Sequence, residues 1–256
     1  MAFLKMVAII RRRSGMTRRE FFNYHFQVHG SLSTGPSKDL APKIYYQTHF
    51  FDSAYSNESA AQPTFSGHDD TTELYFNDIS HVGAVFSSDH VKSVVGPDGR
   101  NFNDMAGAIA LLSQEQTIYG KDAASNTGLV AKYHLQGADS PEDGSALAAE
   151  LQDDILAAFA PTARTITWDV RKPDNLGILQ YFGSQDGPKL SLILSVYLKD
   201  EERSIEAFRE AQEAFERKVG QKISKNVSFV CFGKRALIFD HVRGLDFDPS
   251  RQPVLF

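Results

Sequence analysis

Short apolar runs and longer amphipathic stretches alternate along this chain of 256 residues. Short runs rich in β-branched and aromatic residues are typical of strands, whereas apolar positions spaced three to four residues apart indicate helices. The expected strands are residues 4–10, 43–51, 71–77, 114–120, 129–135, 164–170, 190–198 and 227–232, with 235–239 extending or pairing with the last. The expected helices are residues 18–29, a stretch from Asp78 or Ser80 toward Lys92, 145–159 and 201–219.

The first helix carries a sequence signal at each end. Thr17 is followed three residues later by Glu20, a capping box that predicts a helix beginning at Arg18. Gly30 is a common type of helix terminator, so the helix is expected to end by His29.

Two small, polar stretches separate the apolar runs. Residues 53–70 predict a long loop, with His68 and the two aspartates after it in solvent. The alternative is that this loop is a lid and that these residues contribute an acid. Residues 121–128 have the composition of a linker. We therefore divide the chain into a first half, a degenerate second half and a C-terminal tail, at residues 1–121, 128–243 and 244–256.

The order of elements is β-α-β-β-α-β, and it occurs twice without obvious sequence identity between the copies. Each copy is expected to fold as a ferredoxin-like unit, a four-stranded antiparallel sheet with helices on one face. The other face of each sheet also needs cover. The predicted fold class is therefore α+β, with two ferredoxin-like units closing a barrel within one chain and a ligand site in the space between the sheets.

Composition is ordinary for a globular protein, with 42% hydrophobic and 23% charged residues and a net charge of −5. No basic stripe with interleaved aromatics predicts a nucleic-acid partner, and no apolar run approaches the roughly 20 residues of a membrane helix. The N-terminus lacks a signal-peptide pattern, so a cytoplasmic location is expected. The single cysteine, Cys231, has apolar neighbours that indicate an inert core thiol. Nineteen Phe and nine Tyr indicate an aromatic core or a pocket for a flat apolar ligand.

The candidate catalytic residues are polar side chains on the second strand and the first helix. Tyr45, Gln47 and His49 alternate along the strand and so share one face, while His25 and His29 lie one helical turn apart. Together they resemble two walls of one pocket. Imidazole exchanges protons near neutral pH, and a tyrosine hydroxyl can hold an oxyanion. We predict His49, His29 and Tyr45 as catalytic residues, with the alternative that His29 only ties the helix end to backbone.

Other strands are expected to complete the substrate site. Strand alternation lets only one of Tyr133 and His134, and one of Trp168 and Asp169, face the barrel interior. The predicted substrate contacts are Gln47, Tyr75, His25, Tyr133 and Trp168.

No metal and no cofactor is predicted. The i, i+4 spacing of His25 and His29 suits a metal, with His49 as the third ligand, but a bare pair of this kind is a weak signal. The sequence has no phosphate-binding loop, no dinucleotide fingerprint and no Gly-x-Ser-x-Gly motif, so ATP, NAD and a serine nucleophile are not suggested.

The first half resembles the EthD family of dimeric α+β-barrel proteins. The residues that carry the resemblance are Thr17-Arg18-Arg19-Glu20-Phe21, Tyr24-His25, Val28-His29-Gly30-Ser31-Leu32, Tyr45-x-Gln47-x-His49 and Pro97-Asp98-x-x-Asn101-Phe102-x-Asp104. The resemblance implies that a barrel usually built from two subunits is formed here by tandem halves. It also implies cofactor-free decarboxylation, dehydration or cyclisation in specialised-metabolite pathways, while some similar barrels are anthrone oxygenases or bind haem through a histidine.

The function expected from residues and resemblance together is a cofactor-independent lyase or cyclase acting on an aromatic or polyketide-like intermediate. Two alternatives stay open: a cofactor-free oxygenase of an anthrone or phenol, and a small-molecule-binding barrel without catalysis. The expected partner is a small hydrophobic aromatic substrate, and the protein is expected to be a monomer or homodimer.

Overall fold

The computed structural model describes residues 3–55, 66–121, 127–139, 143–174, 177, 179, 187–199 and 203–255. Parts of the predicted loop at 53–70 and of the predicted linker at 121–128, namely residues 56–65 and 122–126, lie outside the described residues.

Two β-α-β-β-α-β units follow one another along the chain, as the sequence predicts. The first unit consists of β1 (Leu4–Ile10), α1 (Arg18–Asn23), β2 (Ile44–Ala54), β3 (Asp70–Phe76), α3 (Ile79–Ser87) and β4 (Ile109–Tyr119). The second consists of β5 (Gly128–Leu135), α5 (Ser145–Phe159), β6 (Ala163–Lys172), β7 (Leu192–Leu198), α6 (Arg203–Val219) and β8 (Phe229–Asp240). Among the differences from the predicted ranges, β4 begins five residues earlier, at Ile109, and the last two predicted runs form one continuous strand.

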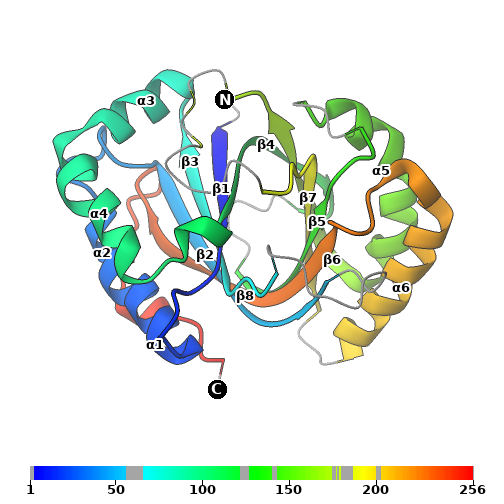
Figure 1. Ribbon diagram of the computed structural model, residues 1–256. Helices are drawn as coiled ribbons and strands as arrows, with labels where there is room; N and C mark the ends of the chain where they lie inside the picture. Colours follow the sequence, from blue (N-terminus) through cyan, green and yellow to red (C-terminus); the bar gives the residue numbers. More distant parts are fainter. Residues whose placement is uncertain are drawn as a thin grey trace.

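The described strands close into one antiparallel barrel in the order β1-β3-β2-β8-β5-β7-β6-β4 (Figure 1). Each unit contributes four adjacent strands, and the units join where β2 pairs with β8 and where β4 pairs with β6. The predicted fold class is therefore confirmed: the barrel is complete within one chain.

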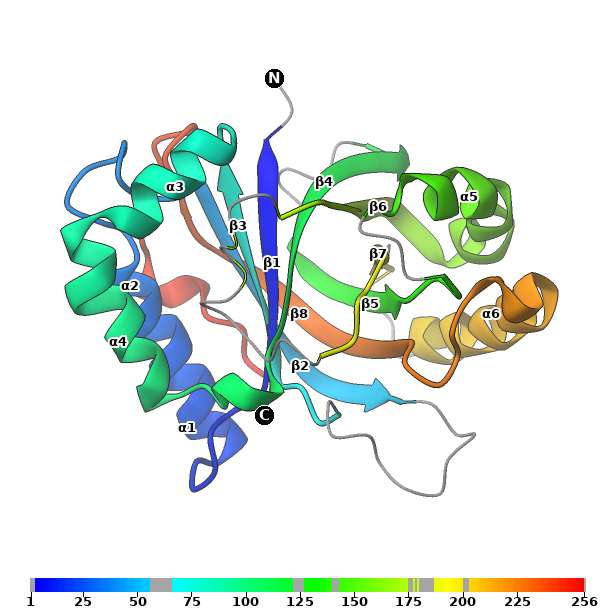
Figure 2. The same cartoon turned by 45° about the horizontal axis from the view of Figure 1, so that its top comes forward.

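Helices cover the outside of the barrel on two opposite sides (Figures 1 and 2). The helices α1 to α4, including α2 (Gly30–Leu32) and α4 (Gly96–Asp98), lie against the first unit's strands, while α5 and α6 lie against the second unit's. Because side chains alternate along a strand, each strand sends one set into the lumen and the other toward its helices. None of the described helices combines the length and the apolar character needed to cross a membrane.

The helix–sheet layer of the second unit is a packed apolar core. Buried residues of α5 and α6 meet the outer faces of β5, β6 and β7, and they include Leu151, Ile155, Phe159, Phe208 and Phe215. Tyr133 and Trp168 belong to this layer, so our prediction that they face the barrel interior is wrong. Their neighbours His134 and Asp169 are buried on the lumen side of the same strands.

The first helix begins at Arg18 with the expected capping box but does not end at Gly30. It continues through a π-helical stretch (Tyr24–His29) into α2. Gly30 has ordinary right-handed helical angles, and a Cβ there would lie 3.2 Å from Cγ2 of Ile238 on β8. The glycine therefore lets the helix lie close to the sheet, and that contact explains the residue better than helix termination does.

Candidate functional site

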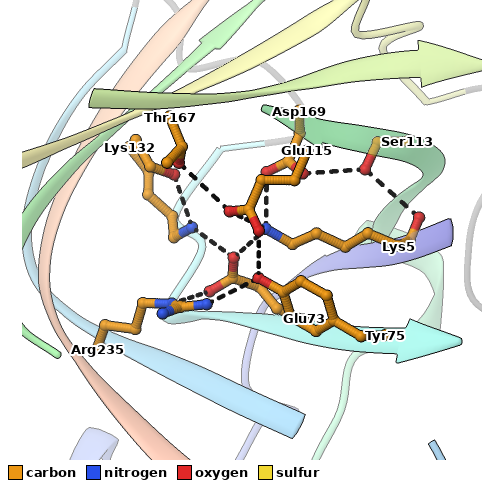
Figure 3. Close-up of polar contacts among 10 residues, drawn as sticks. Lys5, Glu73, Tyr75, Ser113, Glu115, Lys132, Thr167, Asp169 and Arg235 are labelled. Carbon is orange, nitrogen blue, oxygen red and sulfur yellow. Dashed lines mark hydrogen bonds and ion pairs between the residues drawn. The ribbon is translucent and has the colours of Figure 1, made fainter. Parts of the chain in front are cut away.

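An ion network occupies part of the barrel lumen (Figure 3). The ammonium of Lys5 lies 2.5 Å from Glu73 Oε1, 3.1 Å from Glu115 Oε1 and 3.0 Å from Asp169 Oδ2. Lys132 and Arg235 also pair with Glu73, at 3.2 and 2.7 Å. Lys5, Glu73, Lys132, Asp169 and Arg235 are buried and Glu115 is partly buried, so charged side chains occupy part of the space between the sheets where a ligand site was expected.

Tyr75 points into this lumen as predicted, but it contacts the ion network there. Its hydroxyl donates to Glu115 Oε2 at 2.8 Å and accepts from Arg235. Among the described residues, Glu73, Glu115 and Asp169 also form the one acidic or histidine group spaced to hold a metal ion. The Lys5 ammonium occupies the cation position of that group.

A cavity of about 440 Å³ lies instead on the other side of the first unit's sheet, beneath its helices. This volume falls within the range of small-molecule sites. Most of its lining is apolar, including Ala8, Ile10, Leu74, Val85, Phe86 and Phe102. Its polar lining residues include His25 and His29 on the first helix, Tyr45 on β2 and Thr72 on β3, together with Ser33, His90, Lys92, Arg100 and Asn103.

His29 lines the cavity and is held by a carboxylate. Its Nδ1 lies 2.9 Å from Asp98 Oδ2, and Asp98 also accepts hydrogen bonds from Tyr24 and Asn101. Burial opposes ionisation of Asp98, but the hydrogen bonds from His29, Tyr24 and Asn101 outweigh it and lower its pKa to about 2. With Nδ1 directed at an ionised carboxylate, Nε2 is the nitrogen available to a ligand.

A second polar group runs from the cavity into the helix–sheet layer. Tyr45 Oη lies 3.2 Å from His25 Nε2 and accepts from Gln47 Nε2 at 2.7 Å. Gln47 Oε1 lies 3.1 Å from His49 Nε2, and Thr72 Oγ1 lies 3.3 Å from His25 Nε2. Burial lowers the pKa of both histidines, that of His49 to about 4, so both imidazoles are neutral at pH 7.

Asp70 lies behind this group, directly opposite His49 in the β2–β3 ladder. One carboxyl oxygen is 3.5 Å from His25 Nδ1 and the other is 3.6 Å from His49 Nε2. Neither oxygen has a hydrogen-bond partner among the described residues. Burial raises the pKa of Asp70 to about 8. His68, Asp69 and Asp70 are all buried, so their expected exposure in a solvated loop is wrong.

The structure brings together most of the first-half residues that the sequence singled out. The pocket walls are the predicted ones, His29 on the helix and Tyr45 on the strand, but His25 takes the place at the cavity that was expected for His49. His49 is fully buried and stacks on Phe22 at 4.4 Å, and neither His49 nor Gln47 lines the cavity. The catalytic and binding roles of these residues stay predictions.

Asp98, Thr72 and Asp70 were missed as site residues. Asp98 stands in a motif that carries the family resemblance, which was a usable signal. The two strand residues become visible only when β2 is paired with β3, since Thr72 lies opposite Gln47 and Asp70 opposite His49.

The second unit shows that the fold itself does not need these polar groups. On the helix-facing side of the β2–β3 ladder, the residues directly opposite each other are Tyr45 and Leu74, Gln47 and Thr72, and His49 and Asp70. At the same places in the β6–β7 ladder they are Ile166 with Val196, Trp168 with Leu194 and Val170 with Leu192. Buried polar groups cost stability relative to such apolar pairs, so their presence in one unit alone indicates a function.

A metal or haem would need a ring nitrogen free to bind it at the cavity. Of the three histidines in the lining, His25 Nε2 contacts two hydroxyls and His90 Nε2 lies 2.8 Å from the carbonyl oxygen of Leu32. His29 has the Asp98 carboxylate at Nδ1, so its Nε2 is suited to bind a metal. His29 would hold such a metal or haem iron through Nε2, and the group would supply Lewis-acid or redox chemistry.

The fold and site define a single-chain α+β barrel with a helix-covered cavity in its first unit. A sequence model of the EthD domain matches residues 13–106, which confirms the resemblance of the first half to that family. No curated protein sequence matches the chain.

Several solved structures share the fold. A candidate monooxygenase from Fusobacterium nucleatum subsp. nucleatum ATCC 25586 is 8% identical with a TM-score of 0.51, covering 91% of this chain and 92% of its own. A candidate monooxygenase from Lactobacillus acidophilus NCFM is 10% identical with a TM-score of 0.46, covering 92% and 94%. An anthrone oxidase-like protein is 8% identical with a TM-score of 0.49, covering 93% and 94%. At these identities the likeness concerns the fold alone.

Proposed function

We propose that this protein is a cofactor-independent acid–base enzyme, a lyase or cyclase acting on an aromatic or polyketide-like molecule in the first unit's cavity. The observation that carries the proposal is the pair of carboxyl groups with opposite ionisation. Asp98 is held ionised behind His29, whereas Asp70, with its raised pKa, is mostly protonated at neutral pH behind His25 and Tyr45. Two acidic groups whose pKa values are pushed apart are typical of paired base and acid roles.

His29 is the general base. A proton taken by Nε2 makes an imidazolium whose Nδ1–H faces the Asp98 carboxylate at 2.9 Å. The Tyr45 hydroxyl is the donor for the substrate oxygen on which negative charge develops, and Gln47 holds the phenol in place through its amide N–H.

This arrangement serves three related reactions. In a dehydration or aldol-type closure, a C–H proton moves to His29 Nε2 and its electron pair forms an enolate at Tyr45. The enolate then expels hydroxide, which leaves as water with the proton from His29. Alternatively, it attacks a carbonyl carbon to close a ring, and the alkoxide that forms takes the proton from His29. In a decarboxylation, the C–C electron pair forms the enolate as carbon dioxide departs, and a protonated His29 returns a proton to carbon.

The apolar lining suits the rings of such a substrate. Phe86 and Phe102 line the cavity together with aliphatic residues of β1, β3 and α3. Aromatic ligands gain from burial and from ring contacts of this kind.

Single substitutions at the cavity test the proposal, each with a matched control. A panel of phenols, hydroxynaphthoic acids and anthrones is first screened by thermal shift, and binders are assayed for products by mass spectrometry. Tyr45→Phe is expected to lower kcat roughly 10²–10³-fold, while Tyr133→Phe in the second unit leaves it unchanged. His29→Ala is expected to lower kcat roughly 10²–10⁴-fold, with His81→Ala on α3 as its control. Unchanged turnover in both cavity variants would overturn the proposal, and binding without any product would support the non-catalytic alternative.

A cofactor-free oxygenase is the second candidate, favoured by the fold shared with a candidate monooxygenase. The same base would form an anthrone or phenol anion that reacts with molecular oxygen. Oxygen consumption during turnover distinguishes this reaction from the lyase. A haem absorption band in the purified protein would contradict both cofactor-free reactions.

A further inference from the structure

Asp70 is the second carboxyl group of the proposed pair, but it does not itself line the cavity. It is fully buried, it lies between two imidazoles, and its two oxygens lack hydrogen-bond partners among the described residues. Leu192 holds the corresponding place in the second unit, so the fold accepts an apolar residue there.

The heavy atoms define one line of contacts from Asp70 to the cavity. Asp70 Oδ1 faces His25 Nδ1 at 3.5 Å, and His25 Nε2 faces Tyr45 Oη at 3.2 Å. Tyr45 is the member of this line that donates to a ligand. A carboxyl, a neutral imidazole and a phenol can each donate or accept a hydrogen bond. Hydrogen bonds along this line can therefore be donated either from Asp70 toward Tyr45 or from Tyr45 toward Asp70.

The neighbours of the line fit both directions. Gln47 Oε1 only accepts, so His49 Nε2 donates to it, and the Gln47 amide N–H donates to Tyr45 Oη whichever way the phenol proton points. Thr72 Oγ1, 3.3 Å from His25 Nε2, can donate or accept. None of these neighbouring contacts has to be given up when the direction changes.

We propose that Asp70 is a positioning residue whose protonation sets the direction of this line and so turns the Tyr45 hydroxyl toward the substrate. When Asp70 carries a proton, it donates to His25 Nδ1, His25 Nε2–H donates to Tyr45 Oη, and the Tyr45 proton points to the substrate oxygen. When Asp70 is ionised, His25 Nδ1–H turns to the carboxylate, Nε2 accepts the Tyr45 proton, and the cavity loses its donor.

The charges around Asp70 set the pH at which the change occurs. His49 faces it from β2 and His25 from the helix, while Glu73 and Lys132 act from the lumen. Asp69, the adjacent residue, is paired with Arg12 and Arg18. Burial is the largest influence, which raises the pKa of Asp70 to about 8, so the acid is mainly protonated at neutral pH.

The test is the position of the proton on His25, followed by ¹⁵N NMR of the imidazole nitrogens between pH 6 and pH 10. In the full-length protein we expect His25 to change from the Nε2–H to the Nδ1–H tautomer as the pH rises through about 8. Asp70→Asn presents an amide N–H to Nδ1 and should hold the Nε2–H tautomer throughout. An unchanged His25 tautomer in the wild-type protein across this range would overturn the proposal without any variant being needed.

The consequence for turnover rests on the proposed function and is measured separately. Wild-type kcat should fall about tenfold for each pH unit above the titration, whereas Asp70→Asn should keep its activity at alkaline pH and Asp70→Leu should be impaired at every pH. If the tautomer changes but kcat does not follow it, the hydrogen-bond line stands and Tyr45 is not the donor. If neither changes, the line itself is wrong.

Discussion

Replacing Lys5 by methionine should destabilise the barrel strongly. Methionine keeps much of the length of the side chain but removes the ammonium that contacts three carboxylates at 2.5 to 3.1 Å. Among the described lumen residues, three cations (Lys5, Lys132 and Arg235) balance three anions, so the variant leaves one buried negative charge without a counterpart.

The expected magnitude follows from the distances and from burial. Two unit charges about 3 Å apart attract by roughly 5 kcal/mol at an effective dielectric constant near 20. Taking the ammonium out of water offsets several kcal/mol of that attraction. In the variant the carboxylates keep their own burial cost and lose their partner, and breaking a buried pair in this way typically costs about 3–5 kcal/mol. We expect a loss of that size in the free energy of unfolding.

Urea unfolding at pH 8 measures this loss. Trp168 is the single tryptophan of the chain and is 4% exposed, so its fluorescence reports unfolding of the second unit's core. A double variant, Lys5→Met with Asp169→Asn, restores the charge balance and should recover part of the loss.

The pH dependence provides a second check. Burial raises the pKa of Asp169 to about 6, and removal of the ammonium should raise it further. A folded-state pKa above the unfolded value favours the folded state at low pH, so the deficit of the Lys5 variant should be smaller at pH 5 than at pH 8. A loss below about 1 kcal/mol that does not vary with pH would refute the assignment of Lys5 as the central cation.

Other variants test the helix–sheet layer and the core. Asp70→Asn should raise the melting temperature, and the gain should grow from pH 5 to pH 8. The pKa of Asp70 in the folded protein, about 8, lies above its ordinary value of 3.8, so the stability of the wild-type protein falls as the pH rises through that range. An equal gain at both pH values would contradict this reasoning. Gly30→Val should lower stability by about 1–3 kcal/mol because the valine side chain would meet Ile238. Adding Ile238→Ala to the same chain should recover part of the loss, and no recovery would argue against this contact. Cys231 is fully buried and burial raises its pKa, so it should react with a thiol reagent only in urea; rapid reaction of the folded protein would contradict that burial.

Local sequence patterns were sufficient to predict the helices and strands and their arrangement in a barrel. The β-α-β-β-α-β order, occurring twice, limits each unit to one familiar sheet, and two such sheets need each other to cover their free faces. The capping box at Thr17 and Glu20 fixes the helix start through contacts three residues apart. Such signals depend on neighbours in sequence, which is why they could be predicted.

Long-range pairing decided where the cavity lies. Alternation along β2 shows that Tyr45, Gln47 and His49 share a face, but it does not say whether that face meets the lumen or the helices. Lys5 and Asp169 lie 164 residues apart, and their ion pair is what allows charged side chains to fill the lumen.

The sequence by itself thus determined the fold and a helix–strand pair of candidate residues. Only the tertiary structure placed His25 rather than His49 at the cavity, joined Asp98 to His29, and set Asp70 behind both buried imidazoles. The physical reason is that the ionisation of a carboxyl group depends on its burial and its partners. For both aspartates these include residues far away in the sequence.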